Sequence, residues 1–141
     1  DLVNHVKFVN KFLSDEELGK YLYLTDIYLS PYPNMDQAVS GTLTFAIGCG
    51  RAIVSTAYAY ASEVLQDNRG LLTKPDSKEL AKMINKILEN ENLKIKLQKN
   101  AYALGQTWSW PNIGKKYAYF LEGITNKIIM QEESNIKYAG L

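Results

Sequence analysis

The stretch "QAVSGTLTFAIGCGRAIVST", residues 37–56, passes from a polar loop through a short apolar helix pattern into a strand pattern. Ser40 is a residue type that caps helices, and two glycines end the helical segment predicted over residues 42–50. Residues 52–56, "AIVST", are rich in β-branched side chains and carry no charge, which is typical of a buried strand. A helix that leads directly into a buried strand predicts one unit of a parallel α/β sheet.

The same succession of strand and helix continues on both sides of this stretch. Residues 5–9, "HVKFV", alternate apolar and polar side chains, and Ser14 with Glu17 forms a capping-box pattern before an apolar helix face. A short helix over residues 60–68 leads to a further strand. The strands predicted are 5–9, 26–32, 52–56 and 70–73. This order predicts the α/β class, with a doubly wound parallel sheet and helices on both of its faces.

Strand patterns end near Lys74, and the rest of the chain is predicted to be helical. Asp76 or Ser77 is the expected N-cap of the first of these helices. The helices predicted are 74–90, 91–107 and 115–130. We interpret residues 1–130 as one domain. Residues 131–141 form a tail without a strong hydrophobic periodicity, and one interpretation is that this tail is disordered.

Composition bounds the class of protein. The chain has 141 residues, 46% of them hydrophobic, which is enough apolar material for one core. Its formal charge is only +1, so no electrostatic footprint for nucleic acid is indicated. The single cysteine cannot form an internal disulfide, and no apolar run approaches the roughly 20 residues of a membrane-spanning helix. These features favour a cytoplasmic setting, with peripheral attachment at the inner face of a membrane left open.

The start of the chain and the small number of strands indicate a piece of a larger protein. The sequence begins at Asp1 without a methionine, and the predicted strands are few for a free-standing parallel sheet. We therefore interpret the upstream part of the sheet as missing. The exposed edge of strand 5–9 or the last helix is then expected to favour self-association.

The start of the helix after Ser40 is the candidate ligand site. In parallel α/β sheets, ligands bind at the carboxyl ends of strands, where a helix start offers unpaired amide groups and the positive end of its dipole. Gly41 lets a phosphate approach the backbone, and Ser40 and Thr42 add hydroxyl donors, so the three residues fit a diphosphate. The alternative from composition alone is that Ser40 only caps the helix and Gly41 only packs closely.

Other chemically reactive residues are interpreted as structural. His5 has no partner cluster of Cys, His or Asp in the sequence, so neither a metal site nor a catalytic triad is predicted. Cys49 lies between two glycines after an apolar helix, which is typical of a small buried side chain. Tyr58 and Tyr60 follow a strand and either flank a sugar or base or pack in the core, with packing favoured.

The chain resembles a known family over about residues 3–122. The order "HVKFVNKFLSDEELGKYLYLTDIYLSPY", "QAVSGTLTFAIGCGRAIVST" and "YASEVLQDNRGLL", followed by a helix pair and "WSWPNIGKKYAYFL", resembles the carboxyl-terminal domain of family 4 (group 1) retaining glycosyltransferases of the GT-B fold. The resemblance implies a Rossmann-like domain that binds a nucleotide-sugar donor. It also implies an amino-terminal domain, outside this chain, that holds the acceptor and the basic pair for the diphosphate. Catalysis without a metal ion or other cofactor is implied, because helix amides and basic side chains stabilise the leaving diphosphate.

The resemblance assigns roles to individual residues. It places Phe8, Val9 and Asn10 beside the nucleobase. The family's donor motif has two glutamates, the first near the transferred sugar and the second on the ribose; Gln37 and Phe45 occupy these positions here. Gln37 can still hydrogen-bond to sugar hydroxyls, whereas Phe45 cannot bind a ribose through a carboxylate.

Two functions remain open on this basis. The first is the donor-binding part of a transferase that moves a sugar from a nucleotide to an acceptor, with retention, in bacterial-type polysaccharide or glycoconjugate biosynthesis. The second is a catalytically inactive binding or regulatory module that kept the fold, which the absent glutamates permit. A receiver-like module is disfavoured because Asp26 begins its strand instead of ending it. The sequence leaves open the base, the sugar, the acceptor and the oligomeric state.

Overall fold

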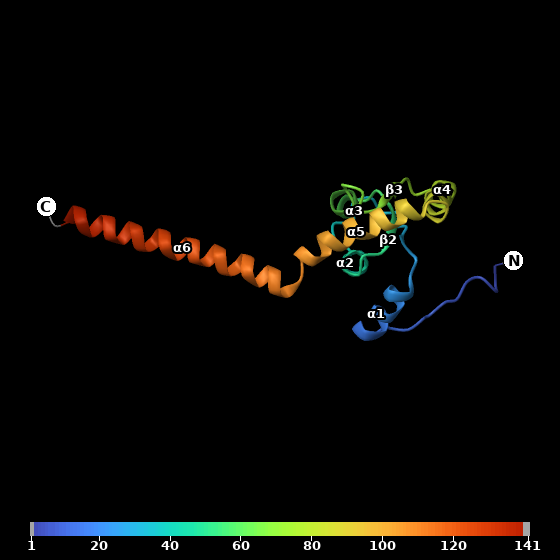
Figure 1. Cartoon of the computed structure of the whole chain (residues 1–141), viewed down its shortest axis with the longest axis horizontal. Coiled ribbons are helices and arrows are strands. Elements are labelled where there is room, and N and C mark those ends of the chain that lie inside the picture. The colour runs from blue at the N-terminus through green and yellow to red at the C-terminus, as the bar shows by residue number, and fades with distance from the viewer. Residues whose placement is uncertain (1, 140–141) are drawn as a thin grey trace.

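The computed structural model describes residues 2–139, with side chains through residue 127. Strands and helices alternate as far as β3, and the remainder is helical (Figure 1). The elements are α1 (Asp15–Leu24), β1 (Ile27–Ser30), α2 (Gly41–Gly48), β2 (Ala52–Thr56), α3 (Ala59–Val64), β3 (Leu71–Thr73), α4 (Ser77–Leu88), α5 (Glu91–Thr107) and α6 (Trp110–Ala139).

The described sheet has three parallel strands in the order β1-β2-β3. The central strand β2 is buried along its whole length, as its β-branched sequence predicts. Successive side chains of a strand point to opposite faces, so Ile53 packs with α2 and α3 while Ala52 and Val54 pack with α4 and α5. Helices therefore cover both faces of the sheet, and the predicted α/β class is confirmed.

Each face of the sheet carries its own apolar cluster. The first cluster lies under α1, α2 and α3 and is the larger; the second lies under α4 and α5. Residues of the first are Leu22, Leu43, Ala46, Ile47, Ile53, Tyr58, Ala61, Val64, Leu65 and Ala101, and of the second Ala52, Val54, Ile87 and Leu97. The fully buried Leu97 and Ala101 lie one helical turn apart, so α5 contributes to both clusters and joins the two faces.

The strand predicted at residues 5–9 is wrong. These residues form a turn and an extended segment outside the sheet, and Phe8 in the middle of it is 88% exposed. An extended segment becomes a strand only when a neighbouring strand satisfies its backbone groups, and β1 pairs only with β2 among the described residues. The alternating pattern was therefore insufficient without a partner strand.

Helix starts follow the capping signals in the sequence. Ser14 and Glu17 form the predicted capping box, with the Glu17 amide donating to Ser14 Oγ at 3.3 Å and the Ser14 amide donating to a Glu17 carboxylate oxygen at 3.1 Å. Asp76 caps α4 by accepting from the amides of Lys78 and Glu79. Local hydrogen-bonding side chains thus decide where these helices begin.

Two charged side chains fix α1 and the start of the sheet. The Arg51 guanidinium donates to the carbonyl oxygens of Tyr23 and Thr25 at 3.2 Å each, where α1 ends with unpaired carbonyls. Lys94 on α5 donates to Asp26 at 2.9 Å, and this bond lowers the pKa of the Asp26 carboxyl. Both contacts hold β1 in place from the end opposite the candidate site.

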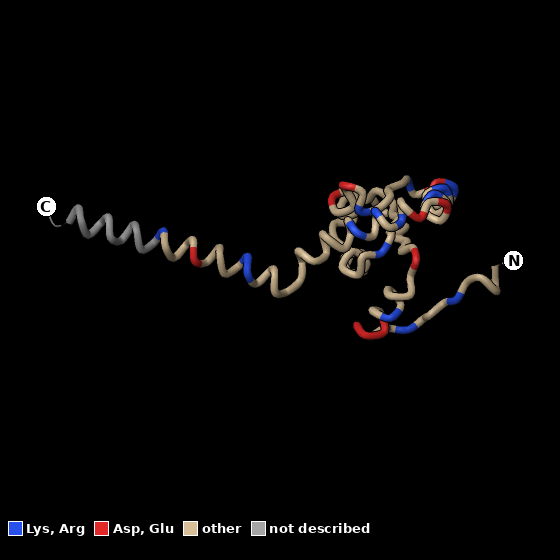
Figure 2. Tube along the Cα trace, in the orientation of Figure 1, with Lys and Arg blue, Asp and Glu red and all other residues tan. Residues whose placement is uncertain are grey.

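The last helix, α6, extends away from the sheet and its covering helices (Figure 1). Charged residues crowd on α4 but are sparse along the described part of α6 (Figure 2). Its exposed large apolar side chains are Trp110, Tyr117, Tyr119, Phe120, Leu121 and Ile124. Among the described residues, no helix combines the length and apolarity that crossing a membrane requires. The predicted domain boundary at residue 130 stays a prediction. In the predicted tail 131–141, residues 131–139 continue helix α6, and residues 140–141 lie outside the described residues.

We expect the 141-residue chain to self-associate through α6 at high concentration, because Tyr117 and Phe120 are 66% and 65% exposed on one helix face. Tyr117→Glu with Phe120→Glu should shift light scattering toward the monomer. Tyr119→Glu is the control, because Tyr119 lies on the opposite face of the helix. A strictly monomeric unsubstituted chain would contradict this prediction.

Candidate functional site

The candidate site lies at the carboxyl edge of the sheet, where β1 ends at Ser30 and a ten-residue loop, 31–40, leads to α2. The next strand, β2, ends beside it at Thr56, and the chain turns there into α3. Parallel strands present their carboxyl ends on one side, so the loop and the starts of α2 and α3 come together.

The loop turns its carbonyl oxygens toward the protein. Thr56 Oγ1 donates to the Tyr32 carbonyl at 2.6 Å, and the Ala59 amide at the start of α3 donates to the Met35 carbonyl at 2.9 Å. The Tyr60 amide donates to the carbonyl of Gln37 at 3.2 Å. The first amides of α3 are thereby used to hold the loop, which fixes the path of the chain into α2.

The last two carbonyls before α2 are satisfied as well. Gln37 Nε2 donates to the Val39 carbonyl at 2.7 Å, and both the amide and the hydroxyl of Thr44 donate to the Ser40 carbonyl at 3.0 Å. The Thr44 hydroxyl also lies 2.8 Å from the Tyr60 hydroxyl. The carbonyl oxygens of Val39 and Ser40, which precede α2, are thus both engaged within the protein.

Ser40, Gly41 and Thr42 occupy the start of α2 in different ways. Ser40 is buried and its Oγ accepts from the Leu43 amide at 3.3 Å, so its capping role is confirmed. Gly41 and Thr42 are exposed, and their amides have no partner within the part of the chain that the structure describes. A Cβ built on Gly41 would meet no atom within 4 Å, so the space in front of this backbone is open.

The tyrosines at this edge divide between the core and the site. Tyr58 is fully buried, its hydroxyl lies 3.1 Å from Ser30 Oγ, and its ring meets Tyr32 edge to face. Packing was the favoured interpretation of Tyr58, and it is confirmed. Tyr28 on β1 was not singled out in the sequence, yet its hydroxyl donates to Thr42 Oγ1 at 2.9 Å. Burial raises the pKa of the Tyr28 hydroxyl above its ordinary value.

The two positions where the resembling family has glutamates carry no carboxylate here. Gln37 is partly buried, and its amide nitrogen is held by its own loop at Val39. Phe45 is 50% exposed and lies about one turn along α2 from Thr42, on the same helix face. The site therefore pairs amide and hydroxyl donors at one end with an apolar ring at the other.

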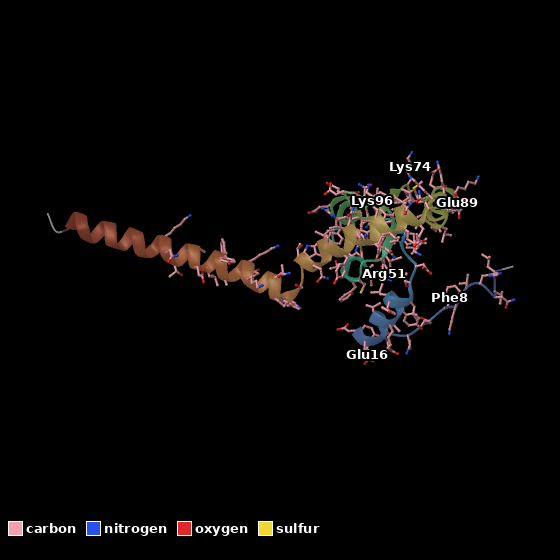
Figure 3. The ribbon with its side chains drawn as sticks, in the orientation of Figure 1. Phe8, Glu16, Arg51, Lys74, Glu89 and Lys96 are labelled. Carbon is pink, nitrogen blue, oxygen red and sulfur yellow. The ribbon has the colours of Figure 1, made fainter. Side chains whose placement is uncertain are left out.

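The structure does not bring the predicted nucleobase residues to this loop. Phe8 lies on the amino-terminal segment, outside the body formed by the sheet and its helices (Figure 3). Val9 is partly exposed and Asn10 exposed, and the Val9 carbonyl accepts from the Lys11 amide at 3.0 Å. Their role beside a nucleobase stays a prediction.

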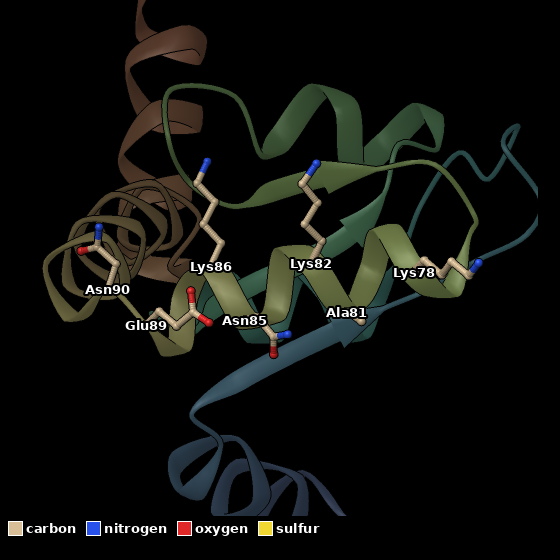
Figure 4. Close-up of a pocket in the computed structure, with 7 residues that line it drawn as sticks. All are labelled: Lys78, Ala81, Lys82, Asn85, Lys86, Glu89 and Asn90. Atoms are coloured by element: carbon tan, nitrogen blue, oxygen red, sulfur yellow. The ribbon is translucent and has the colours of Figure 1, made fainter.

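A surface hollow elsewhere does not compete with this site. It lies along the outward face of α4, where Lys78, Lys82 and Lys86 follow one another at four-residue spacing (Figure 4). In this view Lys82 and Lys86 point the same way and Lys78 points along the helix, and all three lysines are exposed, which is typical of a solvated helix face. Within the described part of the chain, no three His, Cys, Asp or Glu side chains form a cluster that could hold a metal ion.

Comparison with known proteins identifies the family. The model of the family described as "Glycosyl transferases group 1" matches residues 1–104. The chain belongs to the group 1 glycosyl transferases. A glycosyltransferase of Methanocaldococcus jannaschii, itself named as uncharacterized, is 34% identical over 129 residues, which are 89% of this chain and 32% of that protein. The resemblance found in the sequence is thus confirmed.

The fold also matches a solved structure. Sucrose-phosphate synthase from Thermosynechococcus elongatus superposes with a TM-score of 0.72 at 22% sequence identity, over 89% of this chain and 32% of that chain. At this identity the likeness shows the fold alone: the chain has the fold of one part of a larger GT-B structure. The chain spans 32% of the length of both relatives.

Proposed function

We propose that this group 1 glycosyl transferase chain binds the nucleotide-sugar donor, and that its parent polypeptide transfers the sugar with retention of configuration. The start of α2 carries the proposal: exposed amides of Gly41 and Thr42, open space in front of Gly41, and loop carbonyls turned inward. Unpaired amide donors at a helix start suit a diphosphate. Family membership supports the same ligand class.

In the proposed reaction, the main task of this part of the protein is to stabilise the negative charge on the leaving diphosphate. When the glycosidic bond to the sugar breaks, negative charge grows on the diphosphate, and the amides and dipole of α2 stabilise it without a metal ion. Gln37 would contact the sugar and the residues 8–10 the base once the rest of the polypeptide is in place. The acceptor would be held by the amino-terminal domain of the parent polypeptide.

A second candidate is a binding module that kept the nucleotide and lost the reaction. One observation favours it: Phe45 presents an apolar ring, half exposed, where the family has a glutamate for the ribose. An aromatic ring can stack or pack but cannot accept two ribose hydroxyls. Both candidates predict nucleotide binding, and only the first predicts turnover by the parent polypeptide.

Calorimetric titration of UDP, GDP and ADP into the full polypeptide that contains this chain tests the proposed binding. We expect at least one of the three to bind with saturable heat. Sugar transfer from the matching nucleotide sugar would then support the transferase, and binding without transfer would favour the inactive module. Absence of binding for all three would overturn the proposal. The cytoplasmic location, with or without attachment at the inner face of a membrane, stays a prediction.

We predict that the 141-residue chain alone transfers no sugar, because acceptor contacts and half of the cleft would come from the rest of the polypeptide. The measurement is release of nucleoside diphosphate and of glycosylated product from a sugar nucleotide. Turnover by this chain above the hydrolysis background would contradict the prediction.

A further inference from the structure

We propose that Tyr28 is a positioning residue of the donor site, which fixes the Thr42 hydroxyl as a hydrogen-bond donor toward the diphosphate. The contact that carries the proposal is the hydrogen bond from the Tyr28 hydroxyl to Thr42 Oγ1, 2.9 Å long. It joins the edge strand β1 to the first turn of α2, across 14 positions of the sequence. This inference rests on the function proposed above.

Tyr28 is held firmly enough to orient its neighbour. It is the second residue of β1, pairs in register with Ile53 of the central strand, and packs against the larger apolar cluster. Its hydroxyl carries its hydrogen in the neutral range, as that of an ordinary tyrosine does, and burial raises its pKa further. In the hydrogen bond to Thr42 Oγ1, the Tyr28 hydroxyl is the donor.

The hydrogen of the Thr42 hydroxyl is then free to be donated toward the solvent side of the α2 start. Its oxygen accepts from Tyr28, and no described residue accepts the Thr42 hydroxyl hydrogen. The carbonyl of Ser40 is already the acceptor of two hydrogen bonds, from the amide and the hydroxyl of Thr44. The exposed Thr42 hydroxyl thus joins the amides of Gly41 and Thr42 as a third donor at the same helix start.

This arrangement favours ligands with a negative charge. A threonine hydroxyl can donate or accept, and without Tyr28 it would sample three staggered positions and offer its lone pairs to solvent as readily as its hydrogen. With Tyr28 in place, the Thr42 hydroxyl directs its hydrogen to the ligand beside the amides of Gly41 and Thr42, and three such donors favour anionic phosphate oxygens over neutral hydroxyl groups. Removing the Tyr28 hydroxyl should weaken diphosphate binding without removing any group that touches it.

A double-mutant cycle on the full polypeptide tests the assignment, with Kd for UDP, GDP and ADP as the measurement and melting temperature as the check on folding. Thr42→Val should raise Kd about tenfold, because it removes a hydrogen bond to a charged oxygen. Tyr28→Phe should raise Kd about threefold, the factor for releasing one of three rotamers. In the Thr42→Val background, Tyr28→Phe should change nothing further.

Two more variants separate positioning from a structural role. Thr42→Ser keeps a hydroxyl at this position, so the effect of Tyr28→Phe should return in that background. Tyr58→Phe makes the same change at a buried tyrosine whose hydroxyl contacts Ser30 and not α2, and it should leave Kd unchanged. Equal effects of Tyr28→Phe with and without Thr42 would overturn the inference and leave the proposed function standing. Failure of the unsubstituted polypeptide to bind any of the three nucleotides would overturn both.

Discussion

Gly41→Val is expected to raise Kd for the nucleoside diphosphate about 100-fold while the protein stays folded. The loss should be large because a valine side chain would fill the open space through which a phosphate reaches the amides of Gly41 and Thr42. Folding should survive because a Cβ on Gly41 meets no atom within 4 Å and the later turns of α2 keep their hydrogen bonds. Calorimetric titration and thermal melting of the full polypeptide measure the two effects separately.

Gly19→Val supplies the matched control for binding. Gly19 also lies in a helix, α1, and a Cβ built there meets no atom within 4 Å, but the site is on another helix. The Kd of the Gly19→Val variant for the nucleoside diphosphate should equal that of the unsubstituted protein. If Gly41→Val folds and binds with unchanged affinity, Gly41 is not part of a diphosphate site. If it melts earlier without losing affinity, the α2 start has only a structural role.

Much of the fold could be predicted because its signals are local. The buried strand 52–56 and the helix 91–107 appear with the predicted bounds, since apolar runs, caps and helical spacing act over a few residues. The start of α2 at Ser40 was visible for the same reason. Local patterns thus placed the candidate loop at the correct end of the sheet.

What the sequence could not give depends on contacts between distant residues. The segment 5–9 alternates as a strand does, yet no partner strand lies beside it among the described residues. The hydrogen bond between Tyr28 and Thr42 joins residues on different elements, and nothing in "DIYLSPY" marks that tyrosine as a neighbour of the site. The sequence does not distinguish a tyrosine that packs in the core from one that lies beside the candidate site. That distinction requires the fold.

Gly105 is a second residue whose role is set by a distant contact, and its substitution should have the largest effect on folding. Within "YALGQT" it reads as a helix residue that weakens α5. In the structure it is buried against the end of α2, and a Cβ there would lie 2.6 Å from Gly48 Cα and 2.9 Å from the Ile47 carbonyl oxygen. The two helices therefore meet backbone to backbone.

Gly105→Val is expected to lower the free energy of unfolding by about 4 kcal/mol, near the upper end for a single substitution. The clashing atoms belong to the backbone of α2, so no side chain can rotate away, and α5 would have to separate from α2 and loosen the larger apolar cluster around Ala101. That loss is a large fraction of the roughly 5–15 kcal/mol that stabilises a domain. Urea unfolding of the full polypeptide, followed by circular dichroism, measures it.

The comparison with Gly41→Val makes this prediction specific. Both variants add the same side chain to a helical glycine, but one faces open space and the other faces backbone. Gly41→Val should therefore lose binding and keep stability, whereas Gly105→Val should lose stability. A Gly105→Val protein whose urea midpoint matches that of Gly41→Val would show that α2 and α5 do not pack closely at this point. The contact at Gly105 would then not be one of those that hold α2 against the sheet, and it would not help to fix the α2 start relative to β1.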